Sequence, residues 1–193
     1  MEIKKIINNT TNFIIKSFIE IFGLCISLLG LILLASLLTY SPEDPNFIFP
    51  ENTEIKNILG FRGSFVSDLF FQSLGIISIL FSIGLFFNGI IILLSKKVFI
   101  LIENLFYSIL YSLFGSLFFS TYYPDSFWLS LNGNGGFIGN FFQNTFLSSV
   151  INLDKNISYY ILIIIILILF LISINFKINS FLNILKKLIK LSF

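Results

Sequence analysis

The sequence has no histidine, a single cysteine and few charged residues, and each shortage excludes a class of site. Without histidine, the chain lacks the commonest metal ligand and the side chain that titrates near neutral pH. Cys25 alone cannot form an internal disulfide or a cysteine metal cluster. Charged residues make up 11% of the 193 residues, and the formal net charge is +2. A soluble globular domain and a nucleic-acid-binding protein are therefore not expected.

Apolar residues make up 56% of the chain and occur in long blocks that need lipid as a solvent. Each block has at least 20 residues, enough to cross a hydrocarbon core of about 30 Å. The sequence therefore predicts an all-α integral membrane protein with four transmembrane helices, at Ile21–Tyr40, Leu69–Ser95, Asn104–Tyr123 and Ile157–Phe176.

Basic residues near the span ends predict the orientation. With the N-terminus inside, nine lysines lie in cytoplasmic segments, and only Lys56, Arg62 and Lys155 lie in external loops. The positive-inside rule then places both termini in the cytoplasm. An uncleaved first helix is preferred over a signal peptide, because its apolar run is long and no clear cleavage site follows.

Short external helices are expected in both outer loops. In the first loop, 41–68, apolar residues recur at helical spacing after Pro50 and predict a helix on the membrane surface. In the second loop, 124–155, a glycine-rich turn precedes the apolar segment Phe137–Ile151, which is too short to cross and predicts a surface-lying or re-entrant helix. Residues 1–176 then form the membrane domain, and residues 177–193 form a basic amphipathic helix in the cytoplasmic interface.

Catalytic chemistry is poorly represented. No charged residue falls within the four spans, no glycine is followed by lysine as a phosphate-binding loop requires, and no catalytic, cofactor-binding or metal site is predicted. Asn88 is expected to form a helix–helix hydrogen bond, and Cys25 to be a small packing residue. Asp44 and Asp68 are expected to cap a helix or anchor a loop.

One polar stripe follows the third span, with a serine at every fourth position. Small residues at this spacing allow helices to approach closely, so the stripe is expected to face protein and not lipid. A hydrophilic pore lining is the functional alternative. The stripe comprises Ser108, Ser112, Ser116 and Ser120.

Three loop passages resemble the N-terminal four-span membrane domain of the FtsK/SpoIIIE-type bacterial DNA translocases. The exit from the first span is similar to that family's S-x-x-D-P pattern, residues 57–75 to its N-x-x-G-x-x-G, spaced Asp and following Gly, and residues 135–139 to its G-G-x-x-G. The resemblance covers nearly the whole chain. Its residues, expected to be structural or to contact partners, are Ser41, Pro42, Asp44, Pro45, Gly60, Gly63, Asp68, Gly75, Gly135, Gly136 and Gly139.

The resemblance implies a non-catalytic membrane anchor and oligomerisation module of a septal DNA translocase, acting in cell division and chromosome segregation. It implies a homo-oligomer in the bacterial inner membrane that contacts the lipid bilayer and other division-site membrane proteins. The family's ATPase motor is absent from this sequence, so no direct nucleic-acid contact is expected. The motor could be a separate chain, or the protein a truncated or stand-alone paralogue.

Two other function classes stay open from the sequence. A small transporter or channel subunit would use the serine stripe and Asn88. A membrane-embedded enzyme ranks third, because few proton-transfer groups lie at membrane depth.

Overall fold

The computed structural model describes residues 2–45, 54–126, 128–129 and 131–176, and within these residues the chain is helical without strands. The elements are α1 (Glu2–Leu38), α2 (Gly60–Leu74), the 3₁₀ turn η1 (Gly75–Ile77), α3 (Ser78–Ser95), α4 (Phe99–Tyr122), α5 (Gly136–Gln143), α6 (Phe146–Leu153) and α7 (Lys155–Ser173). Among the described residues, four stretches are long and apolar enough to cross a membrane, at Thr10–Leu38, Gly60–Ser95, Phe99–Tyr122 and Lys155–Ser173. The all-α, four-span prediction is confirmed.

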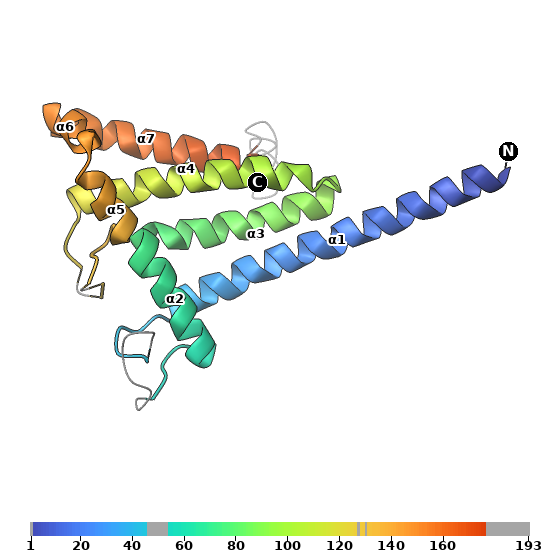
Figure 1. The fold of residues 1–193 in the computed structure, drawn as a ribbon, viewed down its shortest axis with the longest axis horizontal. Coiled ribbons are helices and arrows are strands. Elements are labelled where there is room, and N and C mark those ends of the chain that lie inside the picture. Colours follow the sequence, from blue (N-terminus) through green and yellow to red (C-terminus); the bar gives the residue numbers. More distant parts are fainter. Residues whose placement is uncertain (1, 46–53, 127, 130, 177–193) are drawn as a thin grey trace, which may run out of the picture.

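Four long helices lie side by side as a bundle, with α1 beside α3 and α4 beside α7 (Figure 1). The described residues of the two longer connections lie at one end together with α5 and α6, and this end is here called the loop end (the described residues within 39–59 and 123–154). The short connection at residues 96–98 and the end of α7 lie at the opposite end, here called the turn end. The two loops that carry the sequence motifs therefore face the same side.

Close backbone contact joins α1 to α3. A Cβ atom added at Gly23 would lie 2.9 Å from the carbonyl oxygen of Gly89, and one added at Gly89 would overlap the backbone of Ser27. Gly30 meets the backbone of Phe86 in the same way. Helices in lipid associate through packing and not through the hydrophobic effect, so small residues at the contact allow the approach that stabilises this pair.

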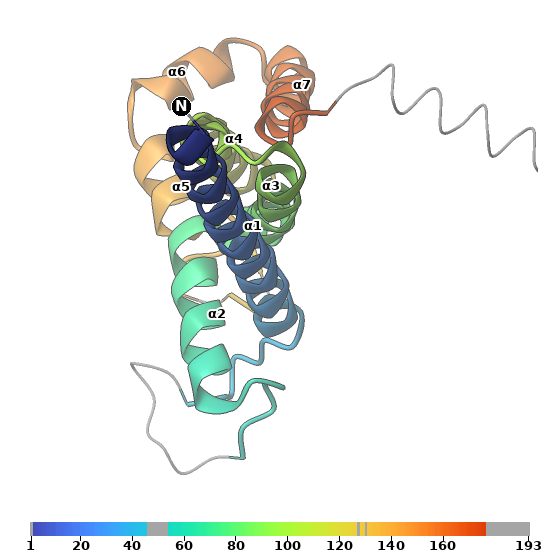
Figure 2. The same cartoon turned by 90° about the vertical axis from the view of Figure 1, so that its right-hand side faces the viewer.

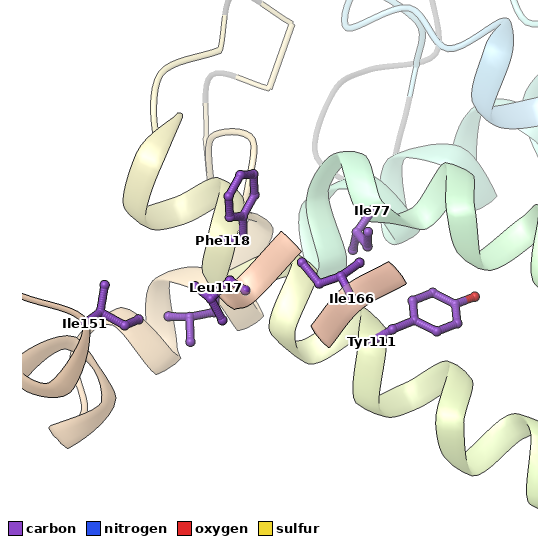
Figure 3. Close-up of a cluster of buried hydrophobic side chains, with 7 residues drawn as sticks. Ile77, Tyr111, Leu117, Phe118, Ile151 and Ile166 are labelled. Carbon is purple, nitrogen blue, oxygen red and sulfur yellow. The ribbon is translucent and has the colours of Figure 1, made fainter. Parts of the chain in front are cut away.

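A cluster of buried apolar side chains holds α4 against α7 and η1 (Figure 3). Tyr111 is fully buried, and its ring packs edge-on against Phe170 of α7 with centroids 5.6 Å apart. Its hydroxyl donates to the backbone oxygen of Leu80 at 3.2 Å, which satisfies the one polar atom in this apolar position. Many side chains on the opposite face of α7 are about half exposed, including Ile161, Ile164 and Ile168. This distribution is typical of a helix with one face toward protein and one toward lipid.

An aromatic group lies at the loop end of the α4–α7 pair. The rings of Phe118 and Tyr122 both pack against Tyr159, with centroids 5.2 and 5.1 Å apart respectively. The hydroxyls of Tyr123 and Tyr159 are 3.0 Å apart, and the hydroxyl of Tyr122 donates to the backbone oxygen of Lys155. Amphipathic rings of this kind are enriched where a membrane meets water.

A salt bridge marks the turn end. Lys96 Nζ lies 2.6 Å from Glu20 Oε1, so the turn after α3 is level with the middle of α1. The residues of α1 that precede Glu20 project past the bundle as a continuous helix (Figures 1 and 2). The sequence places the start of the first span at this level.

Several local predictions differ from the structure. The apolar segment of the second loop is two helices: α5 ends at Gln143, and Thr145 adopts an extended backbone and caps α6 by accepting from Leu147 N. The helix predicted on the membrane surface and the start of the second predicted span together form α2, and the break lies at Gly75 instead of Leu69. Cys25, predicted to be a small packing residue, is exposed on α1. The predicted tail helix, 177–193, lies outside the described residues.

Candidate functional site

Asp44 joins the part of the first loop that follows α1 to the part that precedes α2. This carboxylate is 1% exposed, and its two oxygens accept from the backbone N–H groups of Lys56 and Asn57 at 2.8 and 2.9 Å. The neighbouring Pro45 is also buried, and its carbonyl accepts from the Ser64 hydroxyl at 3.0 Å. The predicted role of Asp44 as a loop anchor agrees with these contacts.

A second set of contacts fixes the start of α2 against the end of α1. The Ser36 hydroxyl donates to the carbonyl of Gly63 at 2.6 Å, and Asn57 Nδ2 donates back to the carbonyl of Ser36 at 2.8 Å. Asn57 Oδ1 accepts from Leu59 N at 3.1 Å. A Cβ at Gly63 would overlap this amide oxygen, so glycine is needed for the approach. Gly60, in contrast, faces open space, and the Ser41 hydroxyl accepts weakly from Glu43 N at 3.4 Å.

An exposed ion pair lies on the surface of this loop. Lys56 Nζ is 2.5 Å from Glu43 Oε2, and the two side chains are 61% and 73% exposed. The lysine lowers the pKa of the Glu43 carboxyl, and the carboxylate raises the pKa of the Lys56 ammonium. Solvent screens such pairs strongly, so this one contributes far less to the loop than the buried Asp44.

Asp68 and Gln72 connect the two motif-bearing loops. Tyr40, at the end of α1, donates from its hydroxyl to Asp68 Oδ1 at 3.1 Å, and Gln72 Nε2 donates to the same oxygen at 3.4 Å. The Gln72 side-chain oxygen then accepts from Asn132 Nδ2 at 3.0 Å. A chain of hydrogen bonds therefore runs from the first loop across α2 to the glycine-rich turn of the second loop. Residues that lie 60 positions apart in the sequence meet here.

The glycine-rich turn packs into the break between α2 and α3. Gly75 has a φ of +75°, and Ile76 N donates to the carbonyl of Asn134 at 2.9 Å. A Cβ at Gly75 would overlap that same carbonyl. Gly136 has a φ of +65° and lies against the backbone of Ser73 and Gly75. Glycine at both positions lets the backbone adopt a left-handed conformation and approach closely. This contact is called the glycine junction below (residues 73–77 with 134–136).

The serine stripe of α4 is buried along its whole length, with exposures of 0–2%. Ser108 and Ser112 donate to the backbone oxygens four residues before them, a usual arrangement in membrane helices. Ser116 instead donates to the carbonyl of Leu74 at 2.7 Å, and Ser120 contacts Asn140 of α5. The stripe therefore faces protein, and its hydroxyls are bonded instead of lining an open path.

Two more glycines bring α5 onto this stripe. A Cβ at Gly135 would lie 2.6 Å from the carbonyl of Ser116, and one at Gly139 would overlap it. Ser116 thus contacts the glycine junction on one side and α5 on the other. Three of the passages singled out in the sequence, at residues 75, 116 and 135–139, form one packed unit.

Buried asparagines form a separate polar contact near the turn end. Asn104 Nδ2 of α4 donates to Asn88 Oδ1 of α3 at 2.5 Å, and Asn175 Nδ2 donates to Asn104 Oδ1 at 3.1 Å. Asn88 is 1% exposed, and its Nδ2 atom has no hydrogen-bond partner among the described residues. The helix–helix hydrogen bond expected of Asn88 is therefore present.

Several residues with structural roles were missed in the sequence. Gln72 connects the loops, and Gly23, Ser27 and Gly89 form the α1–α3 contact. The spacing Gly23-x-x-x-Ser27 is a small-xxx-small pattern and could have identified that contact. Nothing local marks Gln72, because its partner lies in a distant loop.

The described residues contain no group of three or more acidic, cysteine or histidine side chains that could hold a metal ion. Asp44 and Asp68, the acidic residues among the motif positions, are both engaged in contacts that position loops.

One family model matches residues 16–187 of the chain, and its description is the 4TM region of DNA translocase FtsK/SpoIIIE. No curated protein matches the chain, and no solved structure does.

Proposed function

This chain belongs to the family of the 4TM region of DNA translocase FtsK/SpoIIIE, and on that premise we propose that it is a non-catalytic membrane anchor and oligomerisation module of a septal DNA translocase. It acts in cell division and chromosome segregation. The family match over residues 16–187 is the observation that carries the proposal.

The geometry of the loop end supports an anchoring role. The polar side-chain atoms of Asp44, Asp68 and Ser116 form hydrogen bonds that hold backbone segments or neighbouring side chains in place. An anchor needs a rigid surface that partners can recognise, and both motif-bearing loops contribute to one such surface. Other division-site membrane proteins are the proposed partners of this surface.

The proposed location is the bacterial inner membrane, with both termini in the cytoplasm and enrichment at the septum. The lysine bias of the turn end supports this orientation, because Lys96 and Lys97 lie in the short connection between α3 and α4. A homo-oligomer would bring together several copies, and a separate ATPase chain would supply the motor. The chain itself needs no contact with nucleic acid.

Imaging in dividing cells tests the septal role. We expect a fluorescent fusion of the full chain to concentrate at midcell, and the Gly75→Ala variant, which disturbs the glycine junction, to lose that enrichment. Gly60→Ala is the matched control, because its position faces open space. A uniform membrane distribution of the unaltered chain would contradict the proposal.

Flux measurements distinguish the anchor from a small transporter or channel subunit. We expect vesicles that contain the purified chain to show the same ion and solute leakage as empty vesicles. The reason is that the serine hydroxyls of α4 are bonded and buried within the described bundle. Leakage that Ser112→Leu abolishes would favour the transporter class instead.

A further inference from the structure

A cleft of about 490 Å³ lies between α1 and α2 on the loop-end side of the bundle. It exists because the break at Gly75 turns α2 away from the axis of α3, so α2 diverges from α1 (Figures 1 and 2). Its walls are apolar, with Leu29, Ile32 and Leu33 from α1 facing Val66 and Phe70 from α2. Its volume lies within the range of about 300–1,000 Å³ usual for small-molecule sites.

Only two of the lining residues have polar side chains. The Ser36 hydroxyl is already bonded to the carbonyl of Gly63. Arg62 is exposed in the first turn of α2, and within the described part of the chain it makes neither an ion pair nor a hydrogen bond. A guanidinium with all five donors available therefore stands over an apolar cleft.

The surroundings of Arg62 place it where an amphiphile would lie. Ile58 and Phe61, which precede Arg62 in the chain, are 72% and 45% exposed, and Leu29 and Ile32 on the cleft rim are about half exposed. Apolar side chains exposed next to a lone cation are typical of a membrane interface, where the cation reaches headgroups and the apolar surface meets acyl chains.

We propose that this cleft binds an anionic phospholipid, with one acyl chain between α1 and α2 and the phosphate on the Arg62 guanidinium. Arginine matches phosphate through paired N–H donors, and the apolar walls match the acyl chain. A protein helix fits less well. A helix about 10 Å across occupies roughly 420 Å³ per turn, so the cleft would hold little more than one turn.

Photolabelling tests the site directly. The full chain is placed in nanodiscs of phosphatidylcholine with a small mole fraction of phosphatidylglycerol that has a photoactivatable acyl chain, and labelled peptides are mapped. We expect labels to concentrate on residues 29–33 and 66–70. The lipid-facing stretch of α7, residues 161–168, reports labelling by bulk lipid. Equal labelling of the two regions would overturn the proposal.

Two variants separate the headgroup contact from the cleft. We expect Arg62→Gln to lower cleft labelling about tenfold, since a charged hydrogen-bonded contact is lost. Val66→Trp should abolish it by filling the cleft. Lys56→Gln is the matched control, because that exposed cation does not line the cleft. Arg62 is exposed, so Arg62→Gln should leave the fold intact. This variant therefore tests the phosphate contact even if Val66→Trp alters folding.

The same samples show whether another occupant is present. If a second copy of the chain occupied the cleft, Val66→Trp would reduce the mass of the oligomer. Labelling of the cleft in the unaltered protein would then be no higher than the bulk-lipid labelling of α7 residues 161–168. That result would overturn the proposal. Cleft labelling that is unchanged in Arg62→Gln would also overturn the proposal, because it would show that the guanidinium does not bind the lipid phosphate.

Discussion

At the scale of single residues, Asp44 connects the two described parts of the first loop, after α1 and before α2. Its carboxylate accepts from two successive backbone N–H groups while being almost fully buried. Buried donors that lose their partner pay a desolvation cost of about 1–3 kcal/mol each. The loop conformation thus depends on one short side chain.

We expect Asp44→Ala to destabilise the protein by roughly 2–5 kcal/mol, since the buried N–H of Asn57 and the part-buried N–H of Lys56 lose a charged acceptor. Asp44→Asn should cost less, because its amide oxygen can still accept one bond. Unfolding in mixed micelles measures the free energy of unfolding. The control is Glu43→Gln, an exposed neighbour that should change it little. Equal effects of Asp44→Ala and the control would show that the buried contacts carry no energy.

The asparagine contact has an asymmetry that double mutants can measure. Within the described part of the chain Asn88 Nδ2 has no hydrogen-bond partner, whereas both side-chain polar atoms of Asn104 are bonded. We expect Asn104→Leu to cost more than Asn88→Leu, because it leaves Asn88 Oδ1 and Asn175 Nδ2 without partners. The double mutant should show a coupling of about 0.6–1.7 kcal/mol, as for other hydrogen bonds between membrane helices. A reversed order in the unfolding free energies would contradict the assigned donors and acceptors.

At the scale of elements, the glycine junction decides where the second membrane stretch bends. The sequence predicted four apolar blocks correctly, since lipid solvation acts on composition alone. It did not predict the bend at Gly75, because the bend depends on Asn134 filling the space and accepting from Ile76. The same reasoning explains the missed role of Gln72. Contacts between distant loops leave no periodic signal in the sequence.

Gly75 and Gly60 form a matched pair for a test of this junction. Both have positive φ, but only Gly75 faces a neighbouring backbone. We expect Gly60→Ala to cost only backbone strain of about 1–3 kcal/mol. Gly75→Ala should lower the free energy of unfolding by the same strain and by a further amount of about 1–3 kcal/mol from overpacking. Micelle unfolding compares the two variants, and similar losses would mean that the junction yields to the added methyl group.

The serine stripe shows how far the candidate site was accessible from the sequence. Its spacing predicted a face turned toward protein, and the structure buries all four hydroxyls. The spacing could not show that Ser108 and Ser112 donate to the backbone of their own helix. Nor could it show that Ser116 and Ser120 contact other elements. That division depends on where α5 lies, and α5 is placed by Gly135, directly before it, and by Gly139 within it.

At the scale of the whole molecule, both motif-bearing loops lie at one end and the lysine turn at the other. In a Cys25→Ser background, we expect Lys56→Cys and Asn144→Cys to react with a membrane-impermeant maleimide added to intact spheroplasts. Lys97→Cys should react only after permeabilisation, because its end of the bundle is proposed to be cytoplasmic. Labelling of all three without permeabilisation, or the opposite pattern, would contradict the orientation.

The salt bridge between Glu20 and Lys96 has a mechanical consequence. It fixes the level at which α1 leaves its neighbours, and residues 2–19 continue beyond it as an unbroken rod about 27 Å long. Membrane helices adapt to bilayer thickness by tilting, with a typical tilt of about 20°. Over this length such a tilt would sweep the rod's tip sideways by roughly 9 Å. A change in bilayer thickness would therefore move the N-terminal end of α1 sideways.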